Sequence, residues 1–180
     1  MNALDLCLIF SLSKKNIKQF FLVFRMKNFV WCEALSVGID ELDTQHKHFL
    51  ELVNTAHLIK KNKKNSKKVA EELMIEIEAY ARKHFDTEEK YFEEYNYPKA
   101  AEHALEHVKL LERISAMYDG VLFESISIDK VADLLDDWLE HHLLTSDMDY
   151  AKFINTKREC GDGVFSWFCR VLKRIQWFFS

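Results

Sequence analysis

The sequence predicts an all-α protein, namely an up-down-up-down four-helix bundle with an N-terminal arm and a C-terminal amphipathic extension. The chain of 180 residues contains only four glycines and one proline, which leaves little turn chemistry for a β-sandwich or a β-barrel. Four segments instead repeat apolar residues at helical spacing. Because three short connections join these segments, antiparallel packing of neighbouring helices is expected. A chain of this length forms one domain with a sizeable core.

The first two helices are predicted from their apolar stripes. The first covers about residues 40–61, with Asp40 placed to cap its start. Its stripe consists of Leu42, His46, Phe49, Val53 and Ala56. A polar, lysine-rich connection at residues 62–68 precedes the second helix, which runs to about Tyr95. The second stripe consists of Leu73, Ile77, Tyr80, His84, Glu88 and Tyr91.

The third and fourth helices follow in the same way. Pro98 is placed as the first residue of the third helix, a position that suits its fixed φ, and Gly120 is expected to end that helix. The third stripe consists of Ala100, His103, His107, Leu110, Ile114 and Met117. The fourth helix is predicted over about residues 129–153, with a stripe of Val131, Leu135, Trp138 and His142.

Charge and cysteine content narrow the class of protein. Residues 1–30 carry a net charge of +4 and residues 164–180 carry +3, so the intervening residues carry −11. An acidic body argues against a nucleic-acid partner. The four cysteines show no paired metal-binding spacing and no cleavable-looking secretory signal precedes them, so reduced thiols in a cytoplasmic protein are expected. No apolar run reaches the ~18–20 residues that a membrane span needs.

Three parts of the chain are distinguished by composition. Residues 1–25 form an N-terminal extension, residues 26–155 the bundle, and residues 156–180 a basic and aromatic tail. The tail combines the aromatic residues of 164–180 with Arg170, Lys173 and Arg174. This pattern is typical of a basic amphipathic helix on a membrane surface or a protein partner. A fifth helix that packs on the bundle, or a disordered remnant, is the alternative.

Histidines and carboxylates interrupt all four apolar stripes. His84 and Glu88 are four residues apart, as are His103 and His107, so each pair projects from one face of its helix. A buried polar side chain is costly unless it is satisfied, and a metal site satisfies several imidazoles at once. The candidate ligands are too many for one ion that keeps an open position, so two ions joined by bridging anions are expected. The candidate set consists of His46, His84, Glu88, His103, His107, His142 and, less clearly, Asp147, whose five-residue step from His142 lies off the ideal helical face.

Four motifs in this order resemble those of bacterial hemerythrins over about residues 31–150. They are W-x6-GI-x3-D-x-QH-x2-F at 31–49, HF-x2-EE-x8-P at 84–98, H-x3-H at 103–107, and WL-x2-H-x4-D-x2-Y at 138–150. The resemblance implies two iron ions. One would be bound by His103, His107 and His142, and the other by His46 and His84. Glu88, Asp147 and a solvent-derived oxo or hydroxo group would bridge them.

The resemblance also implies reversible O₂ binding at an open position on the two-histidine iron. The protein would then be a non-enzymatic oxygen carrier, store or buffer. An O₂ or redox sensor that signals through its tail, and a di-iron enzyme that consumes peroxide or NO, are the alternatives. Five apolar neighbours of the ligands are expected to form a dry wall around the O₂ pocket: Phe49, Phe85, Trp138, Leu139 and Leu143.

Two other kinds of metal site match parts of the sequence less well. The segment His103–His107 reads H-x-x-E-H, a zinc-peptidase pattern with Glu106 as base, but it leaves the remaining stripe histidines unexplained. Ferritin-like di-iron oxidases use Glu-x-x-His pairs, and no glutamate here has a histidine three residues later. The other histidines are assigned no ligand role: His48 is expected in solvent, His57 in a structural position, and His141 off the stripe that selects His142.

Overall fold

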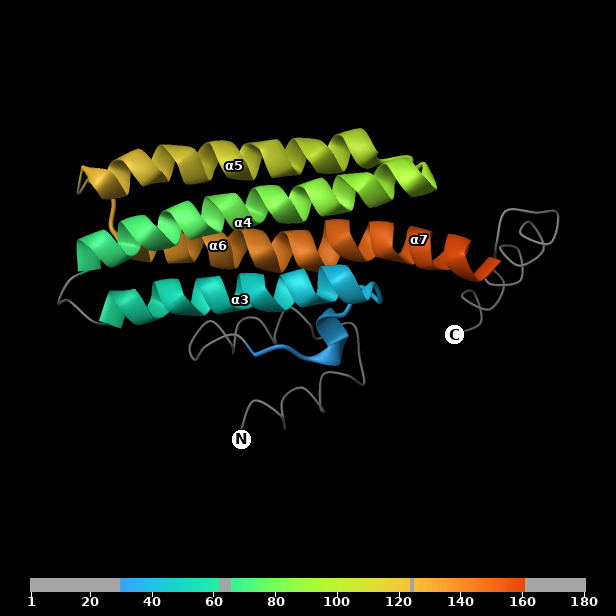
Figure 1. Ribbon diagram of the computed structural model, residues 1–180, viewed down its shortest axis with the longest axis horizontal. Helices are drawn as coiled ribbons and strands as arrows, with labels where there is room; N and C mark the ends of the chain where they lie inside the picture. The colour runs from blue at the N-terminus through green and yellow to red at the C-terminus, as the bar shows by residue number, and fades with distance from the viewer. Residues whose placement is uncertain (1–29, 62–65, 124, 161–180) are drawn as a thin grey trace.

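The computed structural model describes residues 30–61, 66–123 and 125–160, and these form a bundle of four helical rods (Figure 1). The rods are α3 (Asp40–Lys61), α4 (Ser66–Tyr95), α5 (Ala100–Leu122) and a continuous fourth rod. The fourth consists of α6 (Ile128–His142), the π-helical segment η3 (Leu143–Asp147) and α7 (Met148–Cys160). A short 3₁₀ helix, η2 (Glu33–Leu35), precedes α3. Successive rods lie side by side and reverse direction, so the predicted up-down-up-down bundle is confirmed.

The core is built from the predicted stripes. Phe49 and Val53 of α3, Ile77 of α4, Ile114 of α5 and Leu135 of α6 are at most 1 % exposed. Burial of one such side chain contributes about 1.5–3 kcal/mol. Apolar residues fill the bundle on both sides of the level at which the histidines occur, and these two layers hold the rods in register around the polar residues.

The start of α3 differs from the prediction. The Ile39 carbonyl accepts the first helical hydrogen bond, from the Asp43 N–H at 2.9 Å, so Asp40 lies inside the first turn and is not the N-cap. Its charge there still complements the positive end of the helix dipole. The Asp43 carboxylate instead fastens the preceding loop, because it accepts the Val37 N–H at 2.7 Å and the Ser36 hydroxyl at 2.5 Å.

Pro98 lies in the turn between α4, which ends at Tyr95, and α5, and does not start α5. The Tyr97 N–H donates to the Phe92 carbonyl at 2.9 Å and the Asn96 N–H to the Glu93 carbonyl at 3.2 Å, with Asn96 at φ 51°. This pair of bonds is a Schellman motif, after which proline is common because it cannot continue the helix. The prediction that Pro98 begins the third helix was therefore wrong, since α5 starts at Ala100.

Gly120 does not end α5, contrary to prediction. The helix continues through Gly120 to Leu122, and the Gly120 carbonyl accepts the N–H groups of Ser125 and Ile126. A Cβ atom at this position would lie 2.4 Å from Ile126 Cδ1. The glycine is thus required by the close approach of the following loop, which turns back onto the helix.

The fourth rod is longer than predicted, since α7 continues beyond residue 153 to Cys160. Residues 156–160, assigned by composition to the tail, form its last turns. The N-terminal extension 1–25 and the amphipathic segment 164–180 lie outside the described residues. Within the described ranges, no helix has the length and apolarity that crossing a membrane requires.

Candidate metal centre

All seven predicted ligand side chains lie together in the middle of the bundle. His46 comes from α3, His84 and Glu88 from α4, and His103 and His107 from α5. His142 is the last residue of α6 and Asp147 the last residue of η3. Each of the seven is at most 3 % exposed. Such burial of five imidazoles and two carboxylates demands that they satisfy one another or bind a shared partner.

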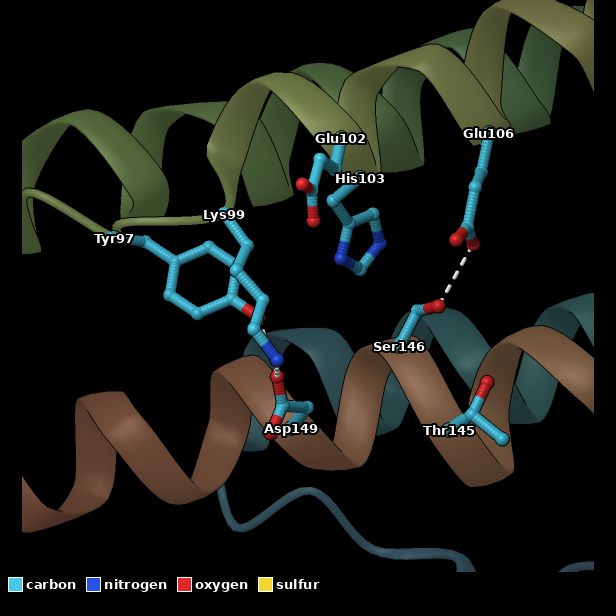
Figure 2. A pocket seen from close by; sticks show the side chains of 8 residues that line it. All are labelled: Tyr97, Lys99, Glu102, His103, Glu106, Thr145, Ser146 and Asp149. Atoms are coloured by element: carbon cyan, nitrogen blue, oxygen red, sulfur yellow. Dashed lines mark hydrogen bonds and ion pairs between the residues drawn. The ribbon is translucent and has the colours of Figure 1, made fainter.

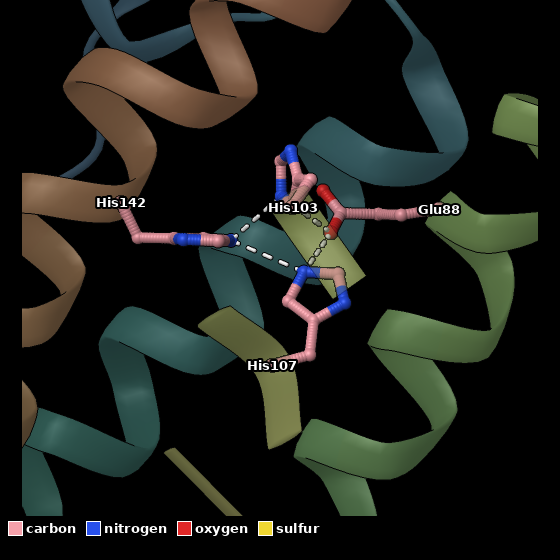
Figure 3. A group of neighbouring side chains, drawn as sticks. All are labelled: Glu88, His103, His107 and His142. Carbon is pink, nitrogen blue, oxygen red and sulfur yellow. Dashed lines mark hydrogen bonds and ion pairs between the residues drawn. The ribbon is translucent and has the colours of Figure 1, made fainter. Parts of the chain in front are cut away.

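Three histidines and Glu88 form one group, which Figure 3 shows. The Nε2 atom of His142 lies 3.0 Å from Nε2 of His103 and 3.2 Å from Nε2 of His107. Glu88 Oε2 lies 3.0 Å from His107 Nε2. The three Nε2 atoms therefore face one another, an arrangement that places ring lone pairs around one point.

A second group contains His46, His84, Glu88 and Asp147. His46 Nε2 lies 3.3 Å from Asp147 Oδ2, and His84 Nε2 lies 3.7 Å from Glu88 Oε1. The other oxygen of each carboxylate faces the three-histidine group, since Asp147 Oδ1 lies 3.1 Å from His142 Nε2. Both carboxylates thus span the two groups.

The π-helical segment η3 explains how Asp147 reaches this position. A step of five residues from His142 lies about 140° away on an α-helix, well off the ligand face. In a π-helix, hydrogen bonds run over five residues, so the wider turn brings position i+5 back over position i. Such π-bulges occur frequently at functional sites. The five-residue step between His142 and Asp147, which α-helical spacing did not favour, is accommodated by this local widening.

The hydrogen bonding within the cluster is incomplete in the way that a metal site would require. Several fully buried atoms have no hydrogen-bond partner among the described residues, although an imidazole or carboxylate atom lies within 3.3 Å of most of them. Three of these atoms face the centre, namely His46 Nε2, Glu88 Oε2 and Asp147 Oδ1, and the other two are the outer nitrogens His46 Nδ1 and His103 Nδ1. Imidazole and carboxylate donors suit iron, zinc and other first-row divalent ions. The side chains therefore fit a pair of bound cations.

The protonation states of Glu88, Asp147 and His84 suit metal binding, whereas burial, which lowers the pKa of His46 and of His142, is outweighed by the facing carboxylates, which raise it. Burial and the charge of Asp147 raise the pKa of Glu88, but the imidazoles of His84 and His107 outweigh them and hold it at about 2. Burial likewise raises the pKa of Asp147, yet the facing histidines keep it well below its usual range. Burial lowers the pKa of His84 to about 4. Anionic carboxylates and a neutral imidazole are the forms that bind metals.

The outward-facing side of the cluster is held by a second layer of polar residues. His84 Nδ1 lies 2.8 Å from Gln45 Oε1, His142 Nδ1 lies 2.8 Å from Glu106 Oε2, and His107 Nδ1 lies 3.3 Å from Glu89 Oε1. Tyr150 donates its hydroxyl to Glu88 Oε1 at 2.7 Å. Such partners fix the tautomer and orientation of a metal-binding side chain.

Sequence reasoning gave none of these second-layer residues such a role. Gln45 and Tyr150 occur inside the quoted motifs, and the sequence suggests Glu106 only as a zinc-peptidase base. In the structure the Glu106 carboxylate lies against His142 Nδ1, and its hydrogen bond from His142 lowers the pKa of Glu106 to about 2.

The predicted apolar wall lies against the ligands. Phe85 stacks on His107 with ring centroids 3.8 Å apart, and Trp138 stacks on His142 at 4.2 Å. Phe49 contacts both His84 and Trp138, with centroids 6.3 Å and 6.0 Å away. Leu139 and Leu143 are buried in the same core.

The remaining histidines lie away from the cluster. The side chain of His48 is 40 % exposed and pairs with Glu51. His57 lies 3.0 Å from the buried carboxylate of Asp136, in the structural role that was expected. His141, next to His142, is exposed. The choice of His142 for the core-facing position therefore agrees with the structure.

A polar pocket of about 340 Å³ reaches the cluster from the surface between α5 and the fourth rod (Figure 2). Lys99 and Asp149 form an ion pair at 2.6 Å at one side of the pocket. Ser146 donates its hydroxyl to Glu106 at 2.7 Å at the other. His103 lines the pocket and is also a member of the three-histidine group, so the pocket ends at the candidate ligands.

Comparisons with known proteins agree with this geometry. The family profile of the Hemerythrin HHE cation binding domain matches residues 37–154. A bacteriohemerythrin of Clostridium acetobutylicum is 28 % identical over 130 residues, covering 68 % of this chain and 98 % of the relative. One of Stenotrophomonas maltophilia is 29 % identical over 151 residues, covering 81 % and 96 %.

Solved structures support the fold. A crystal structure of wild-type hemerythrin superimposes with a TM-score of 0.63 at 22 % identity, covering 69 % of this chain and 95 % of the other. The crystal structure of a hemerythrin mutant gives 0.65 at 20 % identity, covering 70 % and 96 %. Together with the profile match over most of the bundle, these similarities show that the chain belongs to the hemerythrin family.

Proposed function

We propose that this protein binds O₂ reversibly at a non-heme di-iron centre, as an oxygen carrier, store or buffer. His103, His107 and His142 would hold one iron, and His46 and His84 the other. Glu88 and Asp147 would bridge them together with an oxo or hydroxo group. The observation that carries the proposal is the position of the two carboxylates. Each directs one oxygen toward the three-histidine group and its other oxygen toward His46 or His84. Iron is inferred from family membership, since the same donors also accept other divalent ions.

The unequal number of histidines supports ligand binding at one iron. The group of His46 and His84 offers one imidazole fewer than the other group, while both share the same carboxylates. A metal held there retains an open coordination position, which a small ligand requires. When bound, a pair of ferrous ions supplies the two electrons and the coordination position that reversible O₂ binding needs.

The side chains around the centre favour binding over further reaction. Phe49 and Phe85 both contact the His84 ring, with centroids 6.3 Å and 5.7 Å away, and both are at most 2 % exposed. Together with Trp138, Leu139 and Leu143 they form an apolar wall that shields the His84 side of the centre from water. Exclusion of water slows proton delivery and loss of the bound ligand. We therefore assign a non-enzymatic role and place the O₂ pocket on this side.

The proposal is tested by metal analysis combined with optical spectroscopy. Protein loaded with ferrous iron and reduced without air should contain two irons per chain and be nearly colourless. Admission of air should produce charge-transfer bands, and these should fade under vacuum and return with air over several cycles. Protein loaded with Zn²⁺ is the control and should remain colourless throughout.

Other results would contradict the proposal. Irons that oxidise once, without an adduct that vacuum reverses, would exclude an oxygen carrier and favour a sensor or a peroxide- or NO-consuming enzyme. Zinc alone in protein purified without added metal, with no uptake of iron, would exclude the di-iron centre. The expected cytoplasmic location stays a prediction. The membrane or protein contact through residues 164–180 also stays a prediction, since that tail lies outside the described residues.

A further inference from the structure

Three of the five ligand histidines have a partner at the outer nitrogen, and these partners differ chemically between the two sides of the centre, whereas Nδ1 of His46 and of His103 has none among the described residues. On the three-histidine side, His142 Nδ1 faces the Glu106 carboxylate at 2.8 Å and His107 Nδ1 faces the Glu89 carboxylate at 3.3 Å. On the two-histidine side, His84 Nδ1 faces the neutral amide of Gln45 at 2.8 Å. Two anions therefore stand behind one half of the centre and an amide behind the other.

Glu106 is the more firmly placed of the two carboxylates. Its Oε2 atom accepts hydrogen bonds from His142 Nδ1 and from the Ser146 hydroxyl, which lies 2.7 Å away (Figure 2). Ser146 belongs to the π-helical segment that also carries Asp147. Glu106 thus connects α5 to η3 and leaves His142 Nε2 directed at the centre.

A carboxylate that accepts the outer N–H of an imidazole makes that imidazole a more basic metal ligand, and its negative charge stabilises a more highly charged metal. We infer that Glu106, assisted by Glu89, is a positioning residue for His142 that makes the three-histidine half the tighter metal site and the more easily oxidised one. The claim of easier oxidation, the redox part, rests on the proposed di-iron function. The claim of tighter binding, the affinity part, concerns any bound divalent metal.

The affinity part is tested with Co²⁺ alone, titrated into metal-free protein and followed by its visible absorption bands. Glu106→Ala removes both hydrogen bond and charge and should weaken Co²⁺ binding at one of the two sites by about 10–100-fold. Glu106→Gln keeps a hydrogen-bond acceptor for His142 and should weaken Co²⁺ binding less than Glu106→Ala does. Glu102→Gln is the matched control, because Glu102 lines the same pocket but has no hydrogen bond to a ligand histidine among the described residues.

The redox part is tested by potentiometric titration of the iron-loaded variants. Glu106→Gln should move the midpoint potential of one iron to a more positive value, while Glu102→Gln should leave both potentials unchanged. Gln45→Glu, which supplies the missing anion behind His84, should lower the potential of the other iron. A purely structural role of Glu106 would not shift a potential in the isosteric Gln variant, so this measurement separates the two explanations.

Equal Co²⁺ affinity in Glu106→Ala and the native protein would overturn the positioning role, and equal potentials in Glu106→Gln would overturn the charge effect. Should Glu106→Ala fail to fold, Ser146→Ala releases the same carboxylate from η3 and is expected to weaken Co²⁺ binding in the same direction. If the native protein binds Co²⁺ but its iron-loaded form never binds O₂, only the proposed function would be refuted. The affinity comparison would still decide the role of Glu106.

Discussion

The hydroxyl of Tyr150 offers a single-atom test of the polar interior. Tyr150→Phe removes the donor to Glu88 Oε1 at 2.7 Å and leaves the packing of a fully buried ring unchanged. A hydrogen bond to a charged group contributes about 1.5–3 kcal/mol, and the Glu88 carboxylate that loses its donor is fully buried. In a chain of this size, each kcal/mol of lost stability lowers the melting temperature by about 2–4 °C, so a total fall of roughly 3–12 °C is expected.

The assay is urea unfolding of the metal-free protein, because bound metal would add its own stabilisation. The midpoint should fall while the slope m stays constant. Tyr91→Phe is the matched control, since its hydroxyl donates to Glu41 at 3.2 Å on the surface, and a loss of about 0.5 kcal/mol is expected there. Equal free energies of unfolding for Tyr150→Phe and the native protein would refute the reasoning that this bond stabilises the buried carboxylate.

Three further predictions follow from the same contacts. His142→Ala should lose bound metal from the three-histidine group, whereas His141→Ala, at an exposed position, should keep it. Full metal content in the His142 variant, measured by elemental analysis, would show that His142 is not a ligand. Gly120→Ala gains about 1 kcal/mol of helix propensity but forces a contact with Ile126, which costs about 1–3 kcal/mol. A net loss of stability is therefore expected in denaturant unfolding, and a gain would contradict the packing argument. Because its folded pKa of about 2 lies below the unfolded value of 4.5, the Glu88 carboxylate stabilises the metal-free protein fully above pH 4.5, and this contribution is lost as the pH falls toward 2. The stability difference between the native protein and Glu88→Gln should shrink over that range, and a constant difference would show that ionisation of Glu88 is not its source.

The errors of the sequence-based prediction occur at helix ends. Pro98 and Gly120 are residues that commonly mark boundaries, and both were assigned by that local preference. Pro98 instead follows the Schellman motif of α4, and Gly120 admits Ile126 from the loop beyond the helix. Residues that break helices also permit close approach of chain segments, so the identity of the residue alone does not say which of these uses applies.

The sequence by itself determined the four helices, their antiparallel order and the buried faces on which the histidines lie. The helices and their buried faces are local properties, because the 3.6-residue period sets which side chains share a face, and the antiparallel order follows from the short connections. The family resemblance implied Asp147 as a ligand, but α-helical spacing did not explain how it reaches His46 and His142, and only the tertiary structure supplies the π-helical turn that brings it there. It also decided which group stands behind each imidazole, because Gln45 and Glu106 meet their histidines across different helices. A residue's own helix fixes the direction of its side chain, whereas its partner depends on how neighbouring helices are placed against it.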